Sequence, residues 1–188
     1  MIRYHNAVFA LAMTVFLGCS TVQVSQDYKE TTDFSAITTF AWASAVQEKT
    51  GDVRVDSPLM DARIRAAVEM GLAGKGLRDA STGDVDVQVL YQYQIRQQIH
   101  STGTRGSVGV GYGTGGSGGG VMLGTGADVR SYDEGLLIID LIRPSDGTLL
   151  WRGNATFIVP EHPTPEASTA LINEAVDKTL AQFPPKTN

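Results

Sequence analysis

Residues 85–96 read VDVQVLYQYQIR, and their alternation of apolar and polar side chains is the clearest structural signal in the chain. Valine, tyrosine and isoleucine occupy one series of positions, and only Leu90 interrupts the polar series between them. A period of two is the repeat of a β-strand, so this pattern predicts a strand with one buried and one solvated face. We therefore expect Tyr91 and Tyr93 to point into a core on one side of a sheet.

Four more segments have the character of strands: residues 22–28, 37–43, 135–142 and 149–159. The segment 135–142 reads GLLIIDLI, a nearly continuous apolar run that is typical of a central strand. The turn sequence Pro-Ser-Asp-Gly at 144–147 predicts a hairpin with 149–159. Trp151 lies on the apolar face of that last strand, so we expect it in the core with its indole N–H bonded to one partner.

Two segments have the spacing of amphipathic helices. The first begins with Ser-Pro at 57–58, where Ser suits the N-cap and Pro the first helical position, and it ends at the glycines of 74–76. The second opens with Thr-Pro at 164–165 and ends before the prolines at 184–185. Two such helices can cover one face of a sheet. We expect a two-layer α+β domain, with a mostly antiparallel sheet of about five strands.

The composition fits one domain and narrows the classes of partner. The chain has 188 residues, with 15 Lys and Arg against 20 Asp and Glu and a net charge of −5. This acidic balance argues against nucleic acid as a partner, because binding it requires a basic surface. A single cysteine excludes an internal disulfide and a multi-cysteine zinc site, and neither His100 nor His162 has a second histidine at helical spacing. We expect no metal and no cofactor.

The N-terminus has the features of a secretory signal: Arg3, a short apolar run at 7–17 and a small residue, Gly18. The run is too short to span a bilayer. The only cysteine, Cys19, follows directly, and the sequence Phe-Leu-Gly-Cys at 16–19 resembles the lipobox of bacterial lipoproteins, with Phe where Leu is usual. An incidental cysteine after an ordinary secretory signal is the alternative.

The lipobox resemblance implies a processed and lipidated N-terminus. It implies cleavage before Cys19, a diacylglycerol on the cysteine sulfur and an acyl group such as palmitate on the new amino terminus. Several acyl chains make a stable anchor where one is marginal. Ser20, in place of Asp, resembles the signal that sorts lipoproteins to the outer membrane.

These features divide the chain into four parts. We expect a signal peptide at 1–18, a lipidated N-terminus at 19–21, a single α+β domain at 22–185 and a tail at 186–188.

A glycine-rich segment at 101–126 separates two of the expected strands and holds 12 glycines. It suits a long loop between strands. It also suits an extended hairpin arm, whose Val108, Val110 and Tyr112 would contact a partner or another copy of the chain. The nucleophile-elbow pattern around Ser117 arises here from glycine content, because no helix follows it.

Candidate catalytic groups do not form a convincing set. Ser117, Asp140 and His162 occur in the chain order of some hydrolases, but a serine in a glycine run is not held in the geometry that a triad needs. The adjacent acids at 133–134 would point to opposite faces of a strand and could not act together. We therefore expect that the protein is not an enzyme.

Several segments taken together resemble the domain-of-unknown-function family 4136. They are Asp33-Phe-Ser with Phe40-Ala-Trp, Ser57-Pro-Leu with Ile64-Arg-Ala-Ala-Val, Ala73-Gly-Lys-Gly, Asp84-Val-Asp-Val, Tyr132-Asp-Glu-Gly with Leu137-Ile-Ile-Asp-Leu, Leu150-Trp-Arg-Gly, and Ile172-Asn-Glu-Ala-Val with Phe183-Pro-Pro. The resemblance covers nearly all of 22–185, with Lys29 and Leu77 as departures from the residues frequent in the family. It implies an α+β envelope lipoprotein and no assigned activity, so no catalytic residue can be transferred.

We therefore expect a non-enzymatic lipoprotein of the bacterial outer membrane that faces the periplasm. It would act as a structural or interaction component of the cell envelope, with an envelope protein or a second copy as its partner. The alternative is a module that binds a small ligand or glycan on the wet sheet face at Gln88, Gln92, Gln94 and Arg96. A cavity with aromatic residues beside these glutamines would favour the alternative, and a flat face would favour the first.

Overall fold

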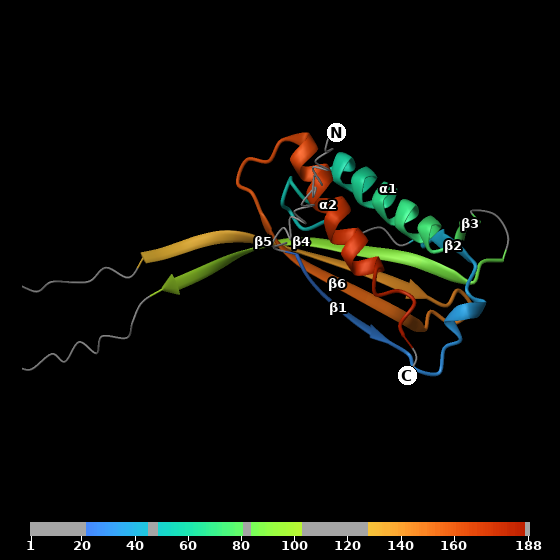
Figure 1. Cartoon of the computed structure of the whole chain (residues 1–188). Coiled ribbons are helices and arrows are strands. Elements are labelled where there is room, and N and C mark those ends of the chain that lie inside the picture. The colour runs from blue at the N-terminus through green and yellow to red at the C-terminus, as the bar shows by residue number, and fades with distance from the viewer. Residues whose placement is uncertain (1–21, 45–48, 81–83, 103–127, 187–188) are drawn as a thin grey trace, which may run out of the picture.

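A six-stranded sheet carries both helices on one of its faces, which makes a two-layer α+β fold (Figure 1). The computed structural model describes residues 22–44, 49–80, 84–102 and 128–186. No helix in these ranges is long and apolar enough to cross a membrane.

The strand order in the sheet is β1-β6-β5-β4-β2-β3. The strands are β1 (Gln23–Tyr28), β2 (Thr39–Trp42), β3 (Arg78–Asp79), β4 (Val87–Thr102), β5 (Asp128–Ile142) and β6 (Leu149–Val159). Strands β1, β6, β5 and β4 pair antiparallel, as predicted, whereas β2 runs parallel to both β3 and β4.

The sheet is thus mixed and has six strands, where the sequence predicted about five in a mostly antiparallel arrangement. The difference has two physical causes. Strand β3 is only two residues long, which is too short for an alternating pattern. Strand β2 is followed by a helix that carries the chain back to the starting end, and such a crossover makes the strands on either side of it parallel.

The helices begin and end close to the predicted residues. Helix α1 (Pro58–Gly74) follows Ser57, but the Ser57 side chain makes no capping hydrogen bond. Helix α2 (Pro165–Leu180) is capped by Thr164, whose side chain accepts a hydrogen bond from the Ala167 N–H. A short 3-10 turn (Phe34–Ala36) precedes β2.

The core lies between the sheet and the two helices, and it follows the predicted alternation. The fully buried large side chains are Trp151, Phe40, Phe157, Phe183, Ile64, Leu72, Leu137, Ile139, Leu141, Ile172, Leu180 and Val68. Tyr93 is buried as predicted, whereas Tyr91 is only half-buried and donates a hydrogen bond to Asp61 Oδ1 at 2.5 Å. The Trp151 indole N–H finds its expected single partner, Gln26 Oε1, at 2.9 Å.

Strands β4 and β5 continue past the rest of the sheet as a two-stranded ribbon, which we call the arm (Figure 1). Pairing of β5 with β6 ends at Asp133↔Val159, but β4 and β5 stay paired from Gln98↔Tyr132 to Thr102↔Asp128. The first residues of the predicted glycine-rich loop, 101–102, therefore belong to β4. Val108, Val110, Tyr112 and Ser117 lie outside the described residues.

Candidate functional site

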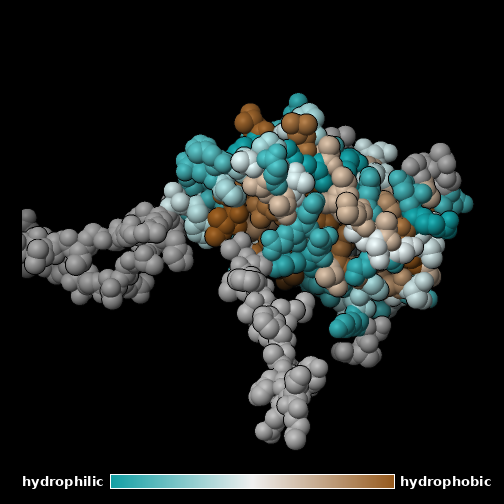
Figure 2. Space-filling model, turned by 45° about the horizontal axis from the view of Figure 1, so that its top comes forward, coloured by the Kyte–Doolittle hydropathy of each residue, from teal (hydrophilic) through white to brown (hydrophobic). Residues whose placement is uncertain are grey.

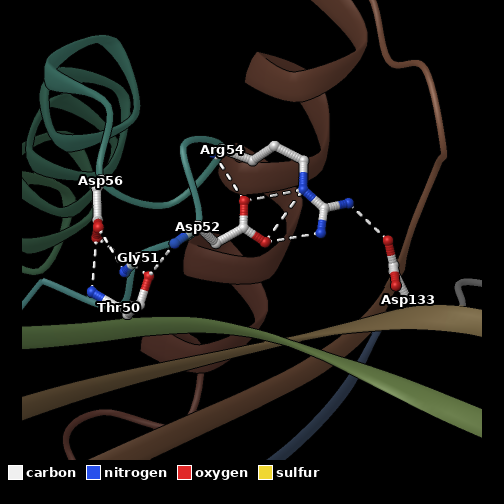
Figure 3. A network of polar contacts seen from close by, with 6 residues as sticks. All are labelled: Thr50, Gly51, Asp52, Arg54, Asp56 and Asp133. Carbon is white, nitrogen blue, oxygen red and sulfur yellow. Dashed lines mark hydrogen bonds and ion pairs between the residues drawn. The ribbon is translucent and has the colours of Figure 1, made fainter.

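The loop that precedes α1 is organised by a carboxylate, Asp56 (Figure 3). Asp56 accepts hydrogen bonds from the backbone N–H groups of Thr50 at 2.9 Å and Gly51 at 2.8 Å, and from the Thr50 hydroxyl at 3.1 Å. These hydrogen bonds hold the pKa of Asp56 below its usual value, and the bond from the Thr50 N–H contributes most. Gly51 has a φ of +84°, a conformation that side chains disfavour. These bonds hold residues 50–56 of the loop in a defined conformation.

Arg54 joins this loop to the base of the arm (Figure 3). Its Nη2 lies 2.7 Å from Asp52 Oδ2, and its Nη1 lies 2.6 Å from Asp133 Oδ2 on β5. The hydrogen bonds to the two carboxylates raise the pKa of Arg54, and the bond to Arg54 lowers the pKa of Asp52. One guanidinium thus carries two ion pairs, one local and one to a residue far along the chain.

A cavity of about 550 Å³ lies between this loop, the first turns of α1 and α2 and the adjacent end of the sheet. We call it the interhelix cavity. Its lining consists of Val53, Arg54, Ser57, Met60, Arg63, Tyr93, Ile95, Val159, Pro160, Glu161, His162, Pro163, Ser168, Leu171 and Ile172. Most of these side chains are apolar, and two are arginines. Figure 2 shows patches of hydrophobic surface on the helix-covered side, one of them close to where the arm leaves the domain.

Tyr93 and Arg63 are two of the polar side chains that line the interhelix cavity. Tyr93 is 2% exposed and stacks on Phe157, with ring centroids 6.2 Å apart. Burial raises the pKa of Tyr93 to about 12, so its hydroxyl stays protonated at neutral pH. Arg63, on α1, donates from Nε to Thr169 Oγ1 on α2 at 3.1 Å. This bond fixes the guanidinium between the two helices.

The candidate catalytic residues do not come together in the described part of the chain. Asp140 forms two short bonds with Arg152, of 2.7 and 2.6 Å, on the sheet face away from the helices. His162 is exposed and lines the interhelix cavity, at the other end of β6. The paired acids diverge as predicted, because Asp133 contacts Arg54 while Glu134 accepts a bond from Gln98 at 3.1 Å.

The predicted wet face of β4 is the uncovered face of the sheet. Gln88 lines a second cavity, of about 650 Å³, whose lining contains no aromatic residue. Arg96 donates to Gln94 Oε1 at 3.0 Å, and Gln92 is exposed. The aromatic cavity that would favour glycan binding is therefore not found beside Gln88.

The sequence analysis did not predict the two arginines of the interhelix cavity. Arg54 has a local signal in the Asp-x-Arg pattern at 52–54, but its second partner is 79 positions away. Arg63 lies on a helix where exposed charge is common, and Thr169 is 106 positions away. Cys19 and Ser20 lie outside the described residues. Within the described ranges no three His, Cys, Asp or Glu side chains are grouped so that they could hold a metal ion.

The architecture defines a two-layer α+β domain with a two-stranded arm and a mainly apolar cavity at the base of that arm. Residues 24–185 match the family described as "Domain of unknown function (DUF4136)". The chain belongs to this family, which confirms the resemblance seen in its motifs.

Solved structures with a similar arrangement are distant in sequence. A PDZ domain protein from Parabacteroides distasonis is 13% identical with a TM-score of 0.47, covering 90% of this chain and 38% of that one. The chain thus spans well under half of that protein. A PelC dodecamer from Paraburkholderia phytofirmans is 13% identical with a TM-score of 0.44, covering 85% and 97%. A second crystal form of PelC gives a TM-score of 0.42, again at 13% identity, covering 82% and 96%. No curated protein matches the chain.

Proposed function

We propose that the protein is a non-enzymatic lipoprotein of the bacterial outer membrane, anchored through Cys19 and facing the periplasm. It serves there as a structural or interaction component of the envelope. The single observation that carries the interaction role is the arm.

The arm supports this role because its two strands have open outer edges within the described residues. From Gln98↔Tyr132 to Thr102↔Asp128, the described part of the chain gives β4 and β5 no pairing partner except each other. An isolated two-stranded ribbon is marginally stable in water. Its outer edges carry backbone donors and acceptors that can bond a further strand. A partner strand, from another envelope protein or from a second copy of this chain, would satisfy these groups and stabilise the ribbon.

The position of β1 supports a site of action close to the membrane. Gln23 at the start of β1 pairs with Thr156, and Thr156 pairs with Leu136, near the base of the arm. The segment that leads from Cys19 therefore enters the domain at the end from which the arm leaves. A lipid anchor at Cys19 would hold a partner of the arm near the bilayer surface.

Glycan binding on the wet face has less support. Its residues are Gln88, Gln92, Gln94 and Arg96, and Arg96 already bonds Gln94. The cavity at Gln88 has no aromatic side chain on which a sugar ring could stack.

Site-specific photocrosslinking in intact envelopes tests the interaction role. We expect a photoreactive residue in place of Ser131, exposed on the arm, to give one specific crosslinked product. The same residue in place of Ser145, exposed in the β5–β6 turn at the far end of the sheet, is the control and should give none. Equal yields at the two sites, or no product at either, would contradict the proposal. Mass spectrometry of the product separates another envelope protein from a second copy.

A further inference from the structure

We propose that the interhelix cavity binds a long-chain carboxylate, with its hydrocarbon chain among the apolar side chains and its carboxylate at Arg63. The cavity volume of about 550 Å³ is within the ordinary range of small-molecule sites, roughly 300–1,000 Å³. The inference concerns a surface separate from the arm and does not depend on the arm's role.

Apolar side chains from every wall of the interhelix cavity provide the environment for a hydrocarbon chain. They are Val53, Met60, Ile95, Val159, Leu171 and Ile172. Val53 is 84% exposed at the rim, whereas Ile172, at 1%, is buried. An apolar lining that runs from an exposed rim to a buried wall suits a hydrocarbon chain that enters from the surface, because each CH₂ group that leaves water for apolar surroundings makes binding more favourable.

The two arginines differ in the charge that they leave available. Arg54 is neutralised by Asp52 and Asp133, at 2.7 and 2.6 Å. Arg63 has only a neutral partner within hydrogen-bonding distance in the described part of the chain, the Thr169 hydroxyl, which accepts from Nε. Its Nη groups therefore remain available to an anion, and a guanidinium matches a carboxylate with two parallel bonds.

The remaining charges around the interhelix cavity are compatible with a bound anion. Glu161 is the one carboxylate in the described lining, and it is exposed on the loop after β6. His162, beside it, is also exposed. The pKa of Glu166 is lowered chiefly by hydrogen bonds with its own backbone N–H and with Thr164. The charge of Arg63 lowers it further, as a smaller effect at longer range. Neither glutamate is within 4.0 Å of Arg63, so neither occupies the place of a ligand carboxylate.

The location of the interhelix cavity gives it access to lipid if the chain is anchored. Val159 lines the cavity and pairs with Asp133 at the base of the arm, at the end of the sheet where β1 begins. Cys19 lies three positions before Val22, so the chain between them can span at most about 11 Å. A molecule that leaves the bilayer surface would meet this end of the domain first.

Photolabelling of the full chain in detergent-free whole-cell lysates, which retain both membrane-bound and soluble forms of the chain, tests the site. The chain carries Cys19→Ala, so that no attached acyl group can compete, and the probe is a palmitate analogue with a photoreactive chain. We expect labelled peptides from α1, α2 and the loop after β6. Arg63→Gln should reduce labelling at low probe concentration by roughly tenfold, since a charge-assisted hydrogen bond is lost. Arg78→Gln, an exposed arginine on β3, is its control and should label normally.

A second pair of variants keeps the test independent of folding. Val53→Asp places a carboxylate at the rim, on a side chain that is 84% exposed, and should reduce labelling several-fold. Leu59→Asp changes a side chain that is 68% exposed and outside the lining, and should leave labelling unchanged. Equal labelling of all four variants, or labels confined to other peptides, would overturn the proposal. It would also fail if the methyl ester of the probe labelled as well as the acid, or if lysophosphatidylglycerol displaced the probe and palmitate did not.

Discussion

Trp151 is the residue whose burial contributes most clearly to stability. Its side chain is 0% exposed, its ring packs edge-on against Phe183 at 5.4 Å, and its N–H bonds Gln26. We expect Trp151→Ala to lower the free energy of unfolding by about 3–5 kcal/mol, a large part of the stability of a domain. Urea denaturation of the purified protein measures this. An unchanged midpoint, combined with loss of the Ser131 crosslink, would instead make Trp151 a recognition residue.

Cys19 is the residue on which the proposed anchor depends. Cys19→Ala removes the only thiol in the chain that can carry a diacylglycerol. We expect an unprocessed precursor, or a soluble product after misprocessing, and no incorporation of radioactive fatty acid. Cells that express the unaltered chain provide the positive control. Label on the alanine variant would show that the protein is not lipidated at this residue.

The Arg54 ion pairs should make stability depend on pH in the acid range. Because Arg54 lowers the pKa of Asp52 in the folded protein, this contribution is present above the ordinary Asp value, about pH 4, and is lost as the pH falls through the folded pKa. Both side chains are partly exposed, so we expect Arg54→Gln to cost about 1 kcal/mol or less at pH 7. The difference from the unaltered chain should shrink at pH 3 in urea titrations. A difference that is constant with pH would contradict this account.

Sequence reasoning at this scale succeeds where a periodic pattern determines the environment of a side chain. The burial of Trp151 and Tyr93 and the opposite directions of Asp133 and Glu134 follow from a repeat of two. Contacts such as Arg54 with Asp133 could not be predicted, because the partners are 79 positions apart and no local pattern links them.

Helix α2 packs closely against β6 at Gly153. A Cβ on Gly153 would lie 2.4 Å from Thr179 Cγ2 on α2 and 2.4 Å from the Trp151 ring. We therefore expect Gly153→Ala to destabilise the fold by about 1–3 kcal/mol through overpacking. Gly74→Ala, where a Cβ would meet nothing within 4 Å, is the control and should be neutral or stabilise slightly. Thermal unfolding of the two variants measures the difference. Equal unfolding midpoints would show that α2 moves away from β6 at no cost in stability.

The predictability of each strand depended on how many of its faces are buried. The alternation in β4 was plain where the helices cover one face. It gave no signal in the arm, where the two strands pair only with each other among the described residues. The strand predicted at 85–96 therefore ended too early, and the strand predicted at 135–142 began too late. The parallel direction of β2 was missed because it depends on the path of α1 and not on a pattern within the strand.

For the molecule as a whole, the segment Gly103–Gly126 joins the two strands of the arm. We expect its replacement by a short Gly-Ser turn to leave the fold intact, since loop closure costs only about 0.6 kcal/mol per doubling of length. If Val108, Val110 and Tyr112 contact a partner, the replacement should weaken the Ser131 crosslink without changing thermal unfolding. A crosslink yield equal to that of the unaltered chain would place the contact on the paired residues of the arm, 98–102 and 128–132. Unfolding of the domain would make the segment part of the core.

The position of β1 at the edge of the sheet has a mechanical consequence. Its residues pair in an unbroken antiparallel register with β6, from Gln23↔Thr156 to Tyr28↔Trp151. The hydrogen bonds of such a ladder are perpendicular to the strands. A tensile force that enters at Val22 along the strand axis therefore loads the whole ladder at once, in shear. The same force applied sideways would break the bonds one after another, so the strand resists a pull along its length far better than peeling.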